Sequence, residues 1–192
     1  MLFSLRYFTF VGLFLCLVGS SQAAESVDTH DGQYRIHPGD VLEVSVWKEE
    51  NMQREILVRP DGEISFPLVG SVPAAGKTIS ELRQDIVNGL NKFIPDPVVT
   101  VGARSLNGNV IYVIGKVARP GPFQIGSFVD VVQALSLAGG TTTYAGVNKI
   151  KVLRRNQQGK LVAIPFKYGE IEKGKNLEQS IILHAGDVVL VP

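Results

Sequence analysis

Residues 34–47 read Tyr-Arg-Ile-His-Pro-Gly-Asp-Val-Leu-Glu-Val-Ser-Val-Trp, a turn followed by a strand. In residues 37–40, His-Pro-Gly-Asp, Pro presets one backbone angle and Gly accepts a positive φ, the order that a type II turn uses. Apolar and polar side chains then alternate over residues 42–46, which predicts a half-buried strand. Residues 183–188, Leu-His-Ala-Gly-Asp-Val, repeat this order, so a turn that feeds a strand is expected at both places.

Short strands and one short helix are expected in the rest of the first half. Residues 56–58 and 64–66 flank Arg-Pro-Asp-Gly at 59–62, which predicts a hairpin. Thr78 and Glu81 have the spacing of a capping box and predict the start of a helix. The apolar stripe of this helix consists of Leu82, Ile86 and Leu90.

The second half has the same mixed character. Polar residues 105–109 contain a Gly and are the candidate boundary between two domains. Ser127 with Asp130 predicts a second capping box, and the helix is expected to run to about Ala138. Strands are expected over residues 110–117, 150–155, 161–166 and 187–191. These patterns predict an α+β fold of two small mixed domains.

The first 23 residues have the layout of a secretory signal peptide. Arg6 is their only charged residue, residues 7–18 are almost wholly apolar, and Ser-Gln-Ala at 21–23 offers a cleavage site. The apolar run of 12 residues is short of the roughly 20 that a membrane span needs, so removal is favoured over a retained anchor. Residues 24–33 are polar and are expected to be a flexible lead-in.

The single cysteine, Cys16, lies inside this predicted signal peptide. As the first residue of a lipoprotein it would need a small residue before it, whereas Leu15 stands there. Cleavage after Ala23 then leaves a chain without disulfides or thiol catalysis. The composition, 45% hydrophobic and 19% charged, is that of a globular chain.

Charge is distributed unevenly along the chain. Residues 24–107 contain 8 Lys+Arg and 13 Asp+Glu, a balance of −5. Residues 108–192 contain 10 and 5, a balance of +5. Unlike surfaces of this kind favour head-to-tail docking between copies, which is the contact that closes a ring.

A group of basic residues surrounds the hairpin expected in the second half. Its members are Lys149, Lys151, Arg154, Arg155 and Lys160. They are candidates for docking onto the acidic first domain of the same or a neighbouring copy, or for contact with an anionic polymer. The opposite charges of the two halves favour docking.

Two aromatic residues are candidates for stacking on sugar rings. Trp47 ends a strand, where such a residue is expected to plug the core. Tyr144 follows three threonines in a loop and is the better candidate for a sugar contact.

No catalytic residue, metal ligand or cofactor is expected. The histidines, His30, His37 and His184, lack the close spacing of metal ligands. The sequence also lacks a Gly-x-Ser-x-Gly elbow and a Gly-x-x-x-x-Gly-Lys phosphate loop. The adjacent pair Glu49-Glu50 is expected to be a solvated loop and not a pair of hydrolase carboxylates.

Several of these stretches together resemble one family. Residues 34–47 and residues 58–70, Val-Arg-Pro-Asp-Gly-Glu-Ile-Ser-Phe-Pro-Leu-Val-Gly, are similar to the opening of outer-membrane polysaccharide export (auxiliary) proteins, and Pro-Asp-Pro-Val-Val at 95–99 continues the pattern. The second half resembles a soluble-ligand-binding β-grasp domain. Its marks are Val-Ile-Gly-Lys-Val at 113–117, Pro-Gly-Pro-Phe at 120–123, and residues 131–140, which end in Ala-Gly-Gly.

The resemblance implies an export domain at 34–106 and a β-grasp domain at 107–192. It further implies a non-enzymatic subunit of a ring that conducts capsular polysaccharide or exopolysaccharide, coupled to an inner-membrane chain-length or assembly protein. The expected place is the periplasm, in association with the outer membrane, with no nucleic acid bound.

Two departures from the family pattern add a further expectation. The chain lacks a convincing lipidation site and stops at Pro192, directly after a strand, where family members with a full pore carry an amphipathic helix. We therefore expect a separate protein to supply the outer-membrane pore. The alternative function is a monomeric periplasmic glycan-binding or adaptor module.

Overall fold

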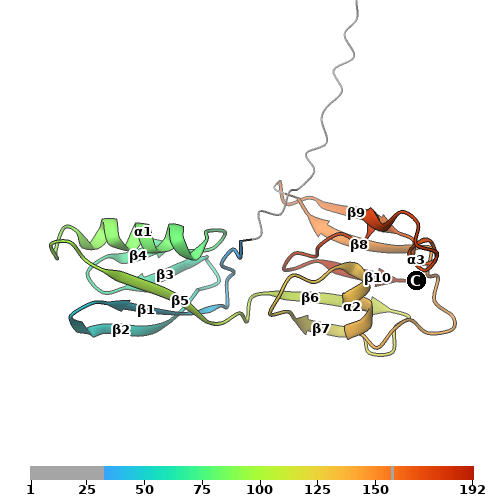
Figure 1. Ribbon diagram of the computed structural model, residues 1–192, viewed down its shortest axis with the longest axis horizontal. Helices are drawn as coiled ribbons and strands as arrows, with labels where there is room; N and C mark the ends of the chain where they lie inside the picture. The colour runs from blue at the N-terminus through green and yellow to red at the C-terminus, as the bar shows by residue number, and fades with distance from the viewer. Residues whose placement is uncertain (1–32, 157) are drawn as a thin grey trace, which may run out of the picture.

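The computed structural model describes residues 33–156 and 158–192 (Figure 1). The predicted signal peptide, Cys16 and the lead-in up to residue 32 lie outside the described residues. The described chain has an α+β fold of two small mixed domains. Its buried apolar residues form two separate clusters, one within residues 36–101 and one within residues 111–191. The two domains lie end to end in Figure 1, joined by the passage from β5 to β6.

The N-terminal domain has five strands and one helix. They are β1 (Val41–Val46), β2 (Glu49–Leu57), β3 (Glu63–Phe66), β4 (Gly70–Pro73), α1 (Ile79–Leu90) and β5 (Val99–Ser105). One antiparallel sheet has the order β2-β1-β5, and β3 and β4 form a separate hairpin. Side chains of the predicted strand alternate as expected, with Leu42, Val44 and Val46 buried in the core.

The predicted hairpin between residues 56–58 and 64–66 is wrong. Strand β2 pairs with β1 through Glu49 and residues 54–57, with an irregularity between them, and β3 pairs with β4, so residues 59–62 link two sheets. The β1–β2 hairpin turns at Trp47 and Lys48, and Lys48 has a φ of 67°. Neither residue is a typical turn former, so the sequence carried no signal for this hairpin.

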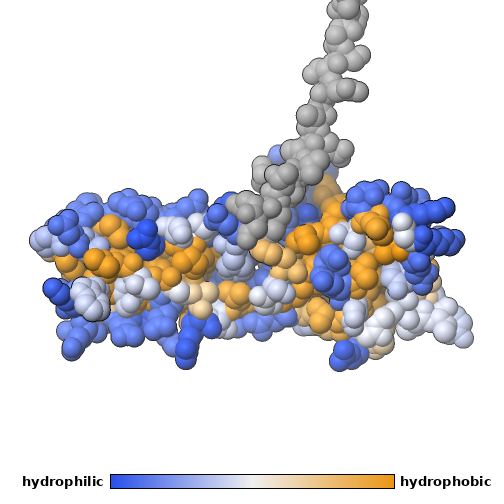
Figure 2. All heavy atoms as spheres, in the orientation of Figure 1, coloured by the Kyte–Doolittle hydropathy of each residue, from blue (hydrophilic) through white to orange (hydrophobic). Residues whose placement is uncertain are grey.

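The first helix, α1, begins as predicted. Thr78 accepts a hydrogen bond from the Glu81 backbone, and the Glu81 carboxylate accepts one from the Thr78 backbone. The bond from the Thr78 backbone to the carboxylate holds the pKa of Glu81 below its ordinary value. The predicted stripe, Leu82, Ile86 and Leu90, is fully buried. Burial of each of these side chains stabilises the fold by about 2 kcal/mol. The outer side of α1 is hydrophilic in Figure 2.

The C-terminal domain wraps one five-stranded sheet around a short helix. Its elements are β6 (Val110–Gly115), β7 (Gly121–Gln124), α2 (Val131–Leu137), β8 (Ile150–Arg155), β9 (Leu161–Phe166), α3 (Tyr168–Ile171), a 3-10 helix at Leu177–Gln179, and β10 (Val188–Val191). The strand order is β7-β6-β10-β8-β9, with β10 parallel to β6 at the centre. First and last strands side by side, with a helix between two hairpins, make this domain β-grasp-like.

The second helix begins later than predicted. Asp130, and not Ser127, is the N-cap of α2, and its side chain accepts a hydrogen bond from the Gln133 backbone while Gln133 reaches back to Asp130. The sequence contains this signal, since Asp and Gln also satisfy the capping-box spacing.

The repeated Gly-Asp turns have the same geometry in both domains. The Asp40 carboxylate accepts a hydrogen bond from the His37 backbone at 2.8 Å, and the Asp187 carboxylate accepts one from the His184 backbone at 2.9 Å. Both aspartates are buried, and each lies next to the strand that its turn feeds. The prediction of two turns that feed strands is confirmed.

Different donors provide the remaining hydrogen bonds to the two buried carboxylates. Tyr34 donates its hydroxyl to Asp40 at 2.6 Å, and the backbone of Gly108 in the interdomain passage donates at 2.9 Å. Burial and the bond to Asp40 raise the pKa of Tyr34, while burial lowers that of His37, whose ring contacts Tyr34. Asp187 is held instead by the guanidinium of Arg154, at 2.6 Å from Nη2 and 3.0 Å from Nε.

Among the described residues, no helix is long and apolar enough to cross a membrane.

The ion pair between Arg154 and Asp187 should stabilise the C-terminal domain. We expect Asp187→Ala to lower the free energy of unfolding by about 3–5 kcal/mol, because it leaves a largely buried guanidinium unpaired. Urea unfolding followed by circular dichroism would measure the change. Arg155→Ala, at the exposed neighbouring residue, is the control and should change stability by less than about 0.5 kcal/mol. Equal stability of the two variants would contradict the expectation.

Candidate functional site

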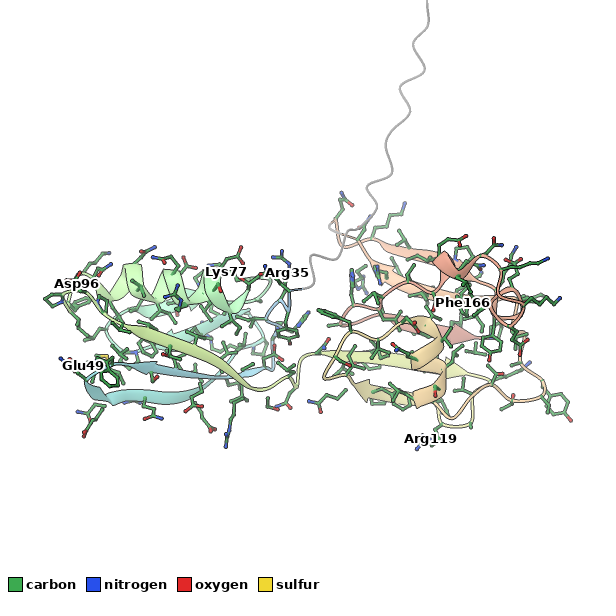
Figure 3. All side chains as sticks on the ribbon, in the orientation of Figure 1. Arg35, Glu49, Lys77, Asp96, Arg119 and Phe166 are labelled. Carbon is green, nitrogen blue, oxygen red and sulfur yellow. The ribbon has the colours of Figure 1, made fainter. Side chains whose placement is uncertain are left out.

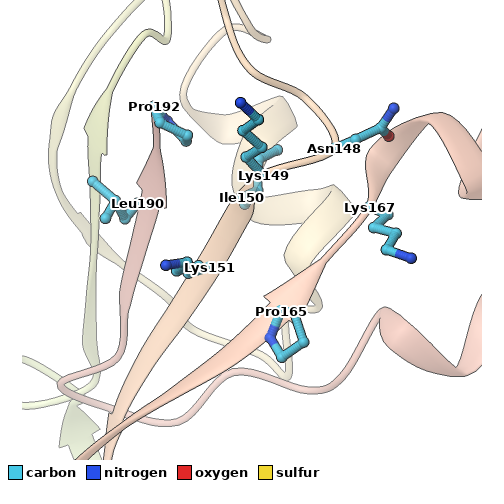
Figure 4. A pocket seen from close by; sticks show the side chains of 8 residues that line it. All are labelled: Asn148, Lys149, Ile150, Lys151, Pro165, Lys167, Leu190 and Pro192. Carbon is cyan, nitrogen blue, oxygen red and sulfur yellow. The ribbon is translucent and has the colours of Figure 1, made fainter.

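A hollow of about 390 Å³ lies on the C-terminal domain. We call it the basic hollow. It is lined by Asn148, Lys149, Ile150, Lys151, Pro165, Lys167, Leu190 and Pro192. Figure 4 shows these residues, which lie in β8, β9 and β10 or directly beside the ends of these strands.

Strand pairing explains why these residues meet. Lys151 pairs with Leu190 of β10 on one side and with Pro165 of β9 on the other, so the three side chains lie in one row on the same face of the sheet. Lys149 directly precedes β8, and Lys167 directly follows its antiparallel partner β9, so both lysines lie at the same end of the hairpin. The hollow therefore combines an apolar floor with ammonium groups around it.

The positive charge of the basic hollow is largely uncompensated. Within residues 33–156 and 158–192, no carboxylate forms an ion pair with Lys149 or Lys151. Lys167 lies 3.4 Å from the Glu170 carboxylate, on an exposed surface where such a pair is weak. A negatively charged partner would find two ammonium groups available here.

The structure separates the basic residues that the sequence grouped together. Lys149 and Lys151 line the hollow, whereas the side chain of Arg154 is 15% exposed and is engaged with Asp187 and the carbonyl of Ile182. Arg155 is exposed at the far end of the hairpin and donates to the Gly159 carbonyl. Arg154 thus binds within its own domain and does not line the hollow, whereas Lys167, which the sequence did not single out, does line it. Lys167 could have been identified from the register of the predicted hairpin, because pairing of residue 150 with residue 166 places Lys167 beside Lys149.

A second hollow, of about 280 Å³, lies on the N-terminal domain beside Trp47. The expectation that Trp47 plugs the core is wrong, because its side chain is 72% exposed. Alternation along the strand explains this: Val46 faces the core, so the next residue faces away from it. Glu49 begins β2 next to this turn, at the end of the domain remote from the C-terminal domain (Figure 3). We call this site the Trp47 hollow.

Tyr144, the other aromatic candidate, is 83% exposed in the loop between α2 and β8. It lines neither of these two hollows. The residues around the hollows offer hydrogen bonds, charge and apolar contact, which are the means of binding. Within the described ranges, no cluster of His, Cys, Asp and Glu could hold a metal ion.

Comparison with known proteins identifies relatives along most of the chain. Residues 28–103 match the family model described as "Polysaccharide biosynthesis/export protein". The chain is 30% identical over 183 residues to the EPS I polysaccharide export outer membrane protein EpsA of Ralstonia nicotianae, covering 82% of this chain and 47% of that protein. It is 25% identical over 174 residues to the capsule polysaccharide export protein BexD of Haemophilus influenzae, covering 80% of this chain and 42% of that one.

A further relative is the exopolysaccharide production protein ExoF of Rhizobium meliloti, 29% identical over 146 residues, with 69% of this chain and 33% of that protein covered. The chain thus spans less than half the length of these curated relatives. Their names are those of export and production proteins.

The exposure of Trp47 can be tested directly, since it is the only tryptophan of the chain. We expect the folded protein to have a water-exposed emission spectrum and to be quenched by acrylamide almost as strongly as the urea-unfolded chain. A blue-shifted emission that acrylamide reaches only after unfolding would contradict the position of this side chain.

Proposed function

Because this chain belongs to the polysaccharide biosynthesis/export protein family, we propose that it is a non-enzymatic subunit of a machine that exports capsular polysaccharide or exopolysaccharide. It works in the periplasm, in association with the outer membrane, after secretion across the inner membrane. The observation that carries this proposal is the family match over residues 28–103, which spans the N-terminal domain to within two residues of the end of β5. Relatives named as export proteins align with most of the remaining chain as well.

In this proposal the two domains are of different types. Residues 34–106 form the polysaccharide export domain, and residues 107–192 form the soluble-ligand-binding β-grasp domain. Copies assemble into a ring through which the polymer passes. A ring needs one surface of each copy to fit a different surface of the next, and the opposite charges of the two halves supply such a pair.

The basic hollow is the surface of the C-terminal domain that docks onto the acidic N-terminal domain of the neighbouring copy. Lys149 and Lys151 are available for this contact, and the apolar floor adds contact area that excludes water. Arg155 extends the basic surface along β8, whereas Arg154 is committed to Asp187 and stabilises the domain itself.

Further partners belong to the same proposal. An inner-membrane chain-length or assembly protein delivers the polymer to the ring. The chain itself positions polymer and partners without chemical change to either.

Loss of the protein should block export. In the source strain, we expect deletion of the gene to lower extracellular polysaccharide severalfold while polymer remains in the cell, and a plasmid copy should restore export. Polysaccharide assays of the culture fluid and of the cell fraction measure both pools. Unchanged extracellular polymer in the deletion strain would overturn the proposed function.

The docking contact makes a separate prediction. We expect Lys149→Glu with Lys151→Glu to weaken self-association of the purified protein at least about tenfold, because two attractions become repulsions. Light scattering at low and high salt would measure it, and high salt should dissociate the wild-type oligomer too.

The control is Lys173→Glu with Lys175→Glu, which makes the same charge change at two exposed lysines of the same domain outside the hollow. Equal loss of assembly in both variants would show that net charge alone is at work and would contradict the assigned contact. A wild-type chain that is monomeric at every salt concentration would favour the alternative of a monomeric glycan-binding or adaptor module.

A further inference from the structure

Trp47 is exposed but its backbone is firmly held. Its N–H donates to the carbonyl of Val98 at 2.9 Å, and the strand that precedes it is paired on both sides. The indole is therefore presented by a rigid sheet and not by a loose loop. Tryptophan is usually well buried, so one that is 72% exposed on a paired strand end is a candidate contact residue.

The groups beside the indole are polar and varied. The polar residues that line the Trp47 hollow are Ser45, Lys48, Glu49, Glu50, Gln53 and Thr100. Hydroxyl, amide and carboxylate groups thus stand next to an aromatic wall. The hydroxyls and the amide donate and accept hydrogen bonds, and the carboxylates accept them.

The same chemistry continues along the open face of the sheet. Ser45 pairs with Thr100 across β1 and β5, and Glu43, on the same face, accepts a hydrogen bond from the amide of Gln53 at 3.3 Å. Gly102, which pairs with Glu43, has open space where a Cβ would stand. The face of the sheet next to the indole is therefore unobstructed. It presents hydrogen-bonding groups in two rows, Ser45 with Thr100 and Glu43 with Gly102.

We propose that the Trp47 hollow binds a sugar residue of the exported polymer. A pyranose ring presents C–H groups on its faces and hydroxyls around its rim. The C–H groups fit the negatively polarised face of the indole, and the hydroxyls fit the polar groups of the hollow. This inference rests on the proposed function for its choice of a polysaccharide as the ligand.

Charge selects the class of sugar. Glu49 and Glu50 outnumber Lys48 in the hollow, and Glu43 lies next along the face. A uronic or sialic acid would meet repulsion from these carboxylates, whereas neutral sugars would not and amino sugars would gain attraction. The site therefore takes neutral or amino sugars, in contrast to the basic hollow of the other domain.

The experiment uses the purified protein and three oligosaccharides of equal length: a neutral glucan, a chitosan oligomer and an oligogalacturonate. We expect the first two to shift the emission of Trp47, which is the sole tryptophan, and the third to leave it unchanged. Calorimetry then compares variants. Trp47→Ala should weaken binding about tenfold, the loss usual for a central aromatic contact, and Trp47→Phe should weaken it less. Phe93→Ala, at an exposed aromatic of the same domain outside the hollow, is the matched control.

The possible outcomes separate this inference from the proposed function. If no oligosaccharide shifts the emission, or if Trp47→Ala binds as the wild type does, the inference is overturned while the export phenotype of the deletion strain still stands. Preference for oligogalacturonate would also overturn it. Loss of self-association in Trp47→Ala, seen by light scattering, would assign the indole to a contact between copies and reject the sugar site.

Discussion

Each domain depends on a buried aspartate that holds the start of a strand. A carboxylate taken out of water must be matched by donors, and the turn before each strand supplies the first one from its own backbone. Asp40 then takes the Tyr34 hydroxyl and an amide from the passage between the domains, so one carboxylate anchors both β1 and the interdomain joint. Asp187 takes the Arg154 guanidinium and so ties β10 to β8 at the centre of the second sheet. The strands that carry both hollows are held by these anchors.

Close packing strengthens the joint between the domains. Gly108 donates to Asp40, and a Cβ at this position would lie 2.3 Å from the carbonyl oxygen of Pro38. Only glycine lets the passage lie so near the turn. The passage that joins the two domains is therefore fixed to the turn before β1 by a specific contact.

Local patterns predicted much of the fold. Alternation over residues 42–46, the box at Thr78 and Glu81, and the Gly-Asp repeat each express a rule that acts within a few residues, and the structure confirms them. The errors arose where partners lie far apart. Nothing near residue 56 tells β2 to pair with β1, and nothing near Arg154 reveals Asp187, 33 residues away. Trp47 is different: strict alternation already pointed its side chain outward, and the general preference of tryptophan for cores wrongly outweighed that local rule.

Both hollows are shallow surfaces, and this bears on how a conduit can work. A polymer must be held well enough to enter and weakly enough to leave, which favours several modest contacts over one deep pocket. An exposed indole and a few hydroxyls bind a sugar loosely, because an open surface leaves much of the ligand in water. Contacts between copies face the opposite demand, since they must persist while polymer passes. Lysines around an apolar floor can meet it, because the apolar contact excludes water and strengthens the attraction of the charges. The two hollows thus match the two kinds of contact that the proposed function requires.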